Sequence, residues 1–377
     1  MEIFSSRVAI RAGEPLGGSD PDRVSSEASD ELEVNGISFS AQDLGEVHIT
    51  AVDALYAGSL TSRFSRDQGH HLFAASHTHY APMLDPDKPL IGRYSNTAVD
   101  AFEEAIRSSQ RKTITPTKCR IYFAQVPCTV YRRFDFPDSL VNRYLTRYCG
   151  FYPNIEREID SSIRIFEFCD DTKSQFVMVY HACHPVAGGL SNKVSTDFVG
   201  PLRDAIRARF GVSTVLFLQG CAADIRPNLA KKRVEWLPKS RLNWRFDWRP
   251  DAISLQRVAE HYREAVVNAR LSVELPMNES ELKAAPSSMR LTGERTVNYT
   301  VFTIPRIGEF VFLPFEVSHL YQLDSARQTD SRFLVSCSNN TLGYLSHPTQ
   351  HRAAGYEVDG SLRFMGLQSR LEIGSWN

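Results

Sequence analysis

The sequence predicts an α/β fold in which a mixed β-sheet is flanked by helices. Short runs of β-branched and other apolar residues alternate along the chain with segments of helical periodicity, which is the pattern of this class. The run 71–76 is almost entirely apolar, as expected of a central strand buried on both faces of a sheet. With 377 residues, 42% of them hydrophobic, the chain is long enough to bury a large core.

The individual elements are expected in the following order. The acidic, glycine- and serine-rich stretch 17–33 predicts a surface loop. Strands are expected, from their β-branched and aromatic residues, at 46–53, 71–76, 119–126, 162–168, 175–181, 214–218 and 333–336. Helices are expected from a cap at Asn96 or Thr97 to about Arg111, and near 199–210 and 253–271. The run 301–313 predicts a hairpin with its turn at Ile307-Gly308. No repeat or linker marks a boundary, so we expect a single domain over 1–377.

Composition excludes several classes of protein. Lys and Arg total 43 against 44 Asp and Glu, so the net charge of −1 gives no reason to expect nucleic acid as a partner. No run of about 18 apolar residues predicts a transmembrane segment, and the first residues do not form a signal peptide. The seven cysteines are odd in number and scattered, without a CxxC pair. We therefore expect a cytoplasmic protein, and the oligomeric state stays open.

The usual motifs GxSxG, HExxH, GxxxxGK[ST] and GxGxxG are absent, and polar residues stand instead where apolar strands end. His77 and His79 follow the run 71–76. Side chains two apart on a strand share a face, so the two rings are expected to converge. They can both bind a metal, or one can bind it while the other acts as acid and base. A pair of hydrogen-bonded structural histidines is an equal alternative on these residues alone.

Two further strands end in the same manner. His181 and His184 differ by three positions and should face opposite sides of a strand, so only one reaches a site, and His184 at the loop edge is favoured. Cys183 is expected to pack in the core, because nothing near it predicts an activated thiolate. Glu316 follows the apolar strand 310–315 and needs a cation if it is buried. The alternative is a carboxylate exposed to water.

A polar turn leads to Tyr344, and Tyr356 follows after 11 residues. Tyrosine is an uncommon metal ligand, whereas two histidines and a glutamate form a known open catalytic zinc set.

These motifs, taken together, resemble the N-terminal catalytic domain of the neutral/alkaline ceramidase family. Five motifs occur in the family's order: Ala-Ser-His77-Thr-His79-Tyr-Ala-Pro, His184-Pro, the segment 219–228, Leu-Pro-Phe-Glu316, and Tyr344 with Tyr356. The resemblance spans nearly the whole chain. The chain is similar to a short, single-domain branch, for which ceramide is not implied as the substrate.

The resemblance implies a zinc ion (Zn2+) bound by His77, His184, Glu316 and Tyr344. It also implies that His79 assists catalysis, that Tyr356 stabilises the oxyanion, and that Arg132 is the site arginine, with Arg133 as a competitor for that role. The expected function is a zinc-dependent hydrolase that uses metal-activated water to cleave an amide (N-acyl) bond of a small-molecule or lipid-like substrate. The alternatives are an esterase or lactonase with the same metal site, and a non-catalytic metal-binding protein.

The segment 226–250 departs from the rest of the chain. It holds eight Lys or Arg residues against two acids, and three of the four tryptophans. Such a segment can be a solvated loop, bind single-stranded nucleic acid, lie on a membrane interface or cover an anionic substrate as a lid. Among the functional alternatives a substrate lid is favoured and nucleic acid is least favoured. The expected partner is therefore an N-acyl compound that can be anionic.

Overall fold

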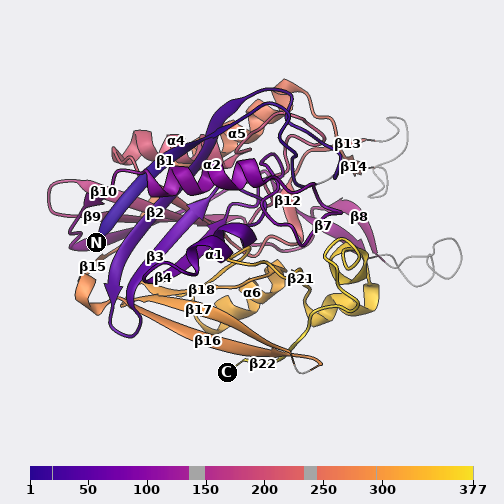
Figure 1. Ribbon diagram of the computed structural model, residues 1–377. Helices are drawn as coiled ribbons and strands as arrows, with labels where there is room; N and C mark the ends of the chain where they lie inside the picture. Colours follow the sequence, from indigo (N-terminus) through magenta and orange to yellow (C-terminus); the bar gives the residue numbers. More distant parts are fainter. Residues whose placement is uncertain (19, 136–148, 233–243, 294, 377) are drawn as a thin grey trace, which may run out of the picture.

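The computed structural model of the protein describes residues 1–18, 20–135, 149–232, 244–293 and 295–376 (Figure 1). Its α/β class is as predicted, but the strands of the described residues form several sheets rather than one. The first sheet has the order β4 (His70–Ala75), β3 (Gly45–Val52), β2 (Ser29–Ala41), β1 (Glu2–Ile10) and β5 (Lys112–Thr113). The second has the order β11 (Val215–Gln219), β10 (Ser174–His181), β9 (Ser162–Cys169), β6 (Lys118–Gln125) and β15 (Arg270–Pro276).

A third five-stranded sheet has the order β20 (Arg332–Val335), β18 (Gly308–Phe312), β17 (Thr296–Ile304), β16 (Lys283–Leu291) and β22 (Ile373–Trp376). Three small sheets join β12 (Ile225–Pro227) with β7 (Thr129–Asp135) and β8 (Cys149–Asn154), β13 (Ala230–Lys232) with β14 (Trp244–Phe246), and β19 (Glu316–Val317) with β21 (Tyr344–Leu345).

The α-helices are α1 (Gly58–Phe64), α2 (Asn96–Arg107), α4 (Val199–Phe210), α5 (Ala252–Val267) and α6 (His319–Gln328). Short helical turns are η2 (Glu279–Glu281), η3 (Pro348–Ala353) and η4 (Tyr356–Gly360).

Alternation along β10 of the second sheet places apolar side chains in core clusters on both faces. In β10, Phe176, Met178 and Tyr180 enter a core cluster shared with the first and third sheets. Val177 and Val179 point the other way, into a cluster that includes residues of α4 and α5. The period of two that predicted these strands therefore also assigns their faces. In Figure 1, α2, α4 and α5 lie in the upper part of the molecule and β16 and β17 in the lower part.

Two helices end earlier than predicted because the residues that follow them pair with a strand. Helix α2 ends at Arg107 rather than Arg111 because residues 112–113 pair with β1. Its cap is Ser95, whose hydroxyl accepts a hydrogen bond from the Ala98 amide, rather than Asn96 or Thr97. Helix α5 likewise ends at Val267, before β15 pairs with β6.

Two further predictions need correction at their edges. The loop expected over 17–33 gives way at Ser29 to β2, which pairs with β1. The turn between β17 and β18 is formed by residues 305–307, one position before the expected Ile307-Gly308. Among the described residues, none of the helices combines the length and the apolar character that crossing a bilayer requires.

Parallel pairing brings several strand ends to one place. Strand β4 runs parallel to β3, β10 to β11, and β18 to β20. The carboxyl ends of parallel strands are where α/β proteins place their sites. The segments after β4, β10, β18 and β20 carry His77, His184, Glu316 and Tyr344, so all four predicted ligands follow the carboxyl ends of such strands.

Candidate metal centre and active site

His77 lies in a loop, not on the strand whose alternation was expected to orient it. Strand β4 ends at Ala75, and His77 has a left-handed backbone with φ of 65°. Its amide donates a hydrogen bond to the Ala54 carbonyl over 2.9 Å, which holds this unfavourable conformation. The rings of His77 and His79 still lie together, with centroids 5.2 Å apart at 90°. The expected convergence is present, but the turn produces it rather than the strand pleat.

His184 enters the same cluster from the loop after β10. Its amide donates to the carbonyl of Ile225 over 3.0 Å, so the loop is fixed to β12. His181 points elsewhere: its Nε2 lies 3.0 Å from the hydroxyl of Tyr262. Cys183 is buried, and burial raises the pKa of its thiol well above the usual value. Of these three residues, only His184 reaches the cluster.

Three acceptor atoms meet at the centre of the cluster. The Nε2 atoms of His77 and His184 are 3.2 Å apart, and the Oε2 atom of Glu316 lies 3.2 Å from the first and 3.4 Å from the second. All three residues are no more than 1% exposed. His79 adds a further ring nitrogen, and one nitrogen from each of the three histidines lies within 4.8 Å of the others.

The hydrogen bonds behind the two rings fix their tautomers. Nδ1 of His77 faces the Leu55 carbonyl at 3.0 Å, and Nδ1 of His184 faces the carbonyl of Ala222. A carbonyl only accepts, so each Nδ1 carries a proton and each ring turns its Nε2 toward the centre. Backbone carbonyls behind Nδ1 are the usual support of metal-binding histidines.

The spacing of the three acceptors fits a tetrahedral metal ion. Zinc ligands at about 2.0–2.1 Å from the ion lie roughly 3.3 Å from one another in a tetrahedron, close to the separations among His77, His184 and Glu316. In addition, Oε2 of Glu316 is buried without a hydrogen-bond donor among the described residues. The donor set therefore fits a divalent cation such as zinc.

Two tyrosines complete the surroundings of Glu316. Strand pairing places Tyr344 directly beside Glu316, with β19 parallel to β21. The hydroxyl of Tyr56 donates to Oε1 of Glu316 over 2.5 Å, leaving Oε2 to face the histidines. Tyr56 was not predicted from the sequence. The available signal was its position just after strand β3, where a polar group ends an apolar run.

Two adjacent arginines share one buried carboxylate beside this cluster. Glu357 accepts from Nε of Arg132 and from Nη1 of Arg133, both over 2.7 Å. Arg132 also reaches the hydroxyl of Tyr344 at 3.4 Å, whereas Arg133 donates to a backbone carbonyl at 2.6 Å. The structure thus turns Arg132 toward the cluster. The role of Glu357 was not predicted from the sequence. The available signal was the pair of neighbouring arginines on a strand, because buried arginines need a carboxylate as a partner.

Tyr356 forms the open edge of the site. Its side chain is 38% exposed, and its ring packs edge-on against Tyr344 at 5.5 Å. It lines an open cleft of about 1310 Å³ whose other walls include Phe151, Leu362 and Phe364. The cleft is large and partly apolar, as expected of a pocket for a small molecule or an acyl chain.

Burial and charge set the protonation of the cluster. Burial, followed by Arg132, lowers the pKa of His184 to about 4, so this ring is neutral at pH 7. Burial opposes the ionisation of Glu316, but the two histidines hold the pKa of its carboxyl well below the usual value. Burial and Glu316 raise the pKa of Tyr356 to about 12, so its hydroxyl keeps its proton and is available as a hydrogen-bond donor.

Asp224 anchors the loop that supports His184. It is fully buried and accepts from Ser318 at 2.6 Å, from Gln350 at 2.7 Å and from Nδ1 of His319 at 3.0 Å. Burial opposes its ionisation, but His319 holds the pKa of Asp224 well below the usual value. This network joins the residue before β12 to α6 and η3.

The basic and aromatic segment is described only at its two flanks, and residues 233–243 lie outside the described residues. Lys231 pairs with Asp247 at 2.7 Å. Trp248 stacks on Phe151, with ring centroids 5.9 Å apart. The flanks therefore pack against β8, next to the open cleft.

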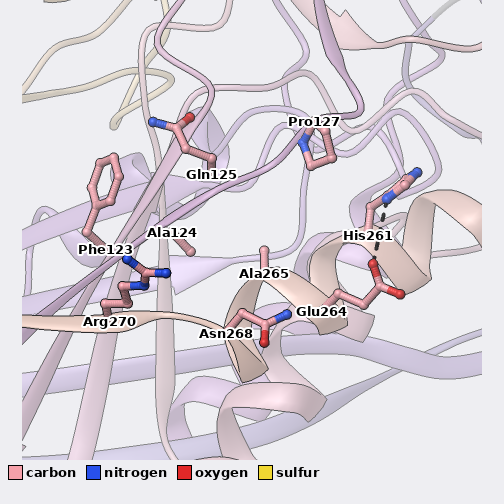
Figure 2. A pocket seen from close by; sticks show the side chains of 9 residues that line it. All are labelled: Phe123, Ala124, Gln125, Pro127, His261, Glu264, Ala265, Asn268 and Arg270. Carbon is pink, nitrogen blue, oxygen red and sulfur yellow. Dashed lines mark ion pairs between the residues drawn. The ribbon is translucent and has the colours of Figure 1, made fainter.

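A separate surface pocket lies between the end of β6 and α5 (Figure 2). Phe123, Ala265 and Asn268 line it, and His261 forms an ion pair with Glu264 there at 4.0 Å. None of the predicted site residues lines this pocket, so it is unconnected with the cluster described above.

Comparison with known proteins identifies the fold. No family model and no curated protein sequence matches the chain. Two solved structures do match its fold. A ceramidase complexed with C2 has a TM-score of 0.60 and 11% sequence identity, with 94% of this chain and 71% of that chain covered. Neutral ceramidase from Pseudomonas aeruginosa has a TM-score of 0.59 and 11% identity, with 94% and 70% covered. The chain therefore has a neutral ceramidase-like fold.

Proposed function

We propose that this protein is a zinc-dependent hydrolase that cleaves the amide bond of an N-acyl substrate. The observation that carries the proposal is the convergence of three buried acceptors, His77 Nε2, His184 Nε2 and Glu316 Oε2, at separations of 3.2–3.4 Å. Three unprotonated acceptors repel one another unless a cation or a proton lies between them. The fold shared with ceramidases supports amide hydrolysis as the reaction.

In this proposal His77, His184, Glu316 and Tyr344 hold the metal ion. A zinc ion bound there would activate a water molecule and polarise the substrate carbonyl. The same fold with these ligands would also serve an esterase or lactonase, so the substrate assay below includes esters.

The protein's own residues supply the other functions. His79, beside the two histidine ligands, is placed to carry a proton to the leaving amine, an acid–base role worth about 10²–10⁴-fold. Tyr356 donates a hydrogen bond to the developing oxyanion, and donors of this kind contribute most when water is excluded. Arg132 holds a polar substrate group next to Tyr344.

The proposal also covers the cellular compartment and the domain organisation of the protein. All seven cysteines are buried and free, which supports a reducing compartment such as the cytoplasm. One core cluster contains residues from Met1 to Val335, which supports a single domain over 1–377.

Elemental analysis of the purified protein tests the metal. We expect close to one equivalent of zinc in the wild type and almost none in His77→Ala or His184→Ala, with unchanged circular dichroism because neither histidine belongs to a hydrophobic cluster. His181→Ala is the matched control, since this histidine is equally buried but faces Tyr262. Full metal content in both ligand variants would contradict the assignment.

A panel of N-acyl compounds and matched esters, with the products measured by mass spectrometry, tests the reaction. Release of the free amine by the wild type but not by His77→Ala supports an amidohydrolase. Exclusive cleavage of the esters would make the protein an esterase instead. Metal binding without turnover of either set would make it a metal-binding protein.

A further inference from the structure

Arg226 is a buried cation without a counter-ion among the described residues. It lies on β12 and is 2% exposed. Within the described ranges its Nε has no hydrogen-bond partner, and no carboxylate of these ranges lies within the 4.0 Å of an ion pair. An unpaired buried charge is destabilising and is retained mainly where a ligand supplies the missing charge.

Aromatic rings surround the Arg226 guanidinium. Its central carbon lies 4.3 Å from the ring centroid of Phe246, 4.9 Å from that of Trp248 and 5.7 Å from that of Phe151. Such stacking favours a cation without neutralising it. A stacked guanidinium keeps its N–H groups in the plane between the rings, where they bind carboxylate or phosphate oxygens in pairs.

Arg226 lies next to the proposed active site. It pairs across the sheet with Val130, two residues before Arg132 on β7. Both guanidiniums approach the ring of Phe151, Arg132 at 5.0 Å and Arg226 at 5.7 Å. Phe151 in turn lines the open cleft that contains Tyr356.

The charges around Arg226 leave an excess of positive charge. Glu357 serves both Arg132 and Arg133, so it has no capacity to neutralise a third arginine. Asp197 affects Arg226 only from beyond ion-pair distance. Burial, followed by Arg132, lowers the pKa of Arg226 to about 10, so the guanidinium is charged at neutral pH.

We propose that Arg226 forms an anion subsite beside the metal cluster, so that the preferred substrate is an N-acyl compound carrying a carboxylate or a similar oxyanion. This inference rests on the proposed function and narrows its substrate class. The buried ring of Phe246, over which the guanidinium lies, would keep water from one face of the ion pair and thereby strengthen it.

Ligand binding tests the subsite without requiring turnover. Binding of N-lauroylglycine, which is anionic, and N-lauroylethanolamine, which is neutral, is measured by isothermal titration calorimetry below their aggregation concentrations. We expect the wild type to bind the anion about 10- to 100-fold more tightly, the effect of one charged hydrogen-bonded contact. Arg226→Gln should reduce this preference to within about threefold, and Arg226→Lys should keep part of it.

Arg245→Gln is the control for general electrostatic attraction. Arg245 also lines the open cleft, but its guanidinium stacks on Tyr152 at 3.8 Å. We expect this variant to keep the preference for the anion. Equal binding of both compounds by the wild type would overturn the subsite. So would an unchanged preference in Arg226→Gln, or an equal loss in Arg245→Gln. If Arg226→Gln does not fold, the test depends on two measurements: the preference of the wild type for the anion, and the partial preference expected of Arg226→Lys.

A third compound, the monoethanolamide of dodecanedioic acid, carries its carboxylate at the far end of the acyl chain. Tighter binding of this compound than of N-lauroylglycine would place the anion on the acyl side, and the reverse would place it on the amine side. Either result supports the subsite. A protein that prefers the anions but cleaves neither amides nor esters would refute the proposed function alone. A protein that binds and cleaves charged and neutral amides equally would refute the subsite alone.

Discussion

Replacing Tyr56 by phenylalanine should weaken metal binding without leaving a large cavity in the core. The hydroxyl of Tyr56 donates to Oε1 of Glu316 over 2.5 Å, and both groups are buried. Phenylalanine keeps the ring, which packs against His77 with centroids 5.4 Å apart, and removes only the donor. Glu316 then loses the donor that fixes Oε1, and its carboxylate is held less firmly toward the histidines.

The expected loss of zinc affinity follows from the negative charge on Glu316, which accepts the hydrogen bond. A hydrogen bond to an ionised group contributes about 1.5–3 kcal/mol, and loss of a supporting contact to a metal ligand typically lowers metal affinity about 10–100-fold. These two estimates agree, because each tenfold change in affinity corresponds to about 1.4 kcal/mol. We therefore expect Tyr56→Phe to raise the dissociation constant for zinc by one to two orders of magnitude.

Competition with a chromophoric chelator measures this constant directly. Tyr122→Phe is the matched control, because Tyr122 also donates to a carboxylate, Oε2 of Glu167, over 2.9 Å, but on the second sheet away from the cluster. That variant should bind zinc as the wild type does. A dissociation constant for Tyr56→Phe within about twofold of the wild type would show that Tyr56 does not orient the ligand.

Three other predictions address catalysis, folding and pH. His79→Ala should keep its metal and lose about 10²–10⁴-fold in kcat; loss of metal to the extent seen in His77→Ala would make His79 a ligand. Asp224→Asn breaks a buried pair with His319 and should lower the free energy of unfolding in urea by about 3 kcal/mol; an unchanged midpoint would contradict this. Burial and His71 lower the pKa of His48 to about 4 from 6.5. The unfolded chain therefore binds the extra proton first, and stability present above pH 6.5 is lost as the pH falls toward 4. After allowance for partial exposure, we expect His48 to contribute about 1–2 kcal/mol to the loss. In urea titrations at pH 7.5 and 4.5, the fall in unfolding free energy should be smaller by this amount in His48→Gln, and the buried His181 and His184 should contribute the remainder in both proteins.

Sequence patterns identified the site residues that follow a strand and missed those that depend on distant pairing. Glu316 and His184 stand where apolar runs stop, and this position is visible in a single sequence. Tyr56 and Glu357 act through partners 260 and 225 residues away. The position of Tyr56 after a strand could have marked it as a candidate, but the local sequence does not reveal either partner. His77 is an intermediate case, since its nearness to His79 was expected but its left-handed backbone was not. The division into several sheets was also missed, because strand runs do not reveal which edges pair.

The wide separation of the four proposed ligands along the chain determines when a metal ion can bind during folding. Residues 77, 184, 316 and 344 come from segments that meet only in the folded protein. A bound ion would join them as a crosslink that closes two loops of more than one hundred residues (77–184 and 184–316) and a shorter one (316–344), so the entropy of loop closure must be lost before the ion gains its full coordination. Partly folded chains should then bind zinc only weakly. The ion would enter late in folding and slow the global unfolding of the finished protein, rather than nucleating its assembly.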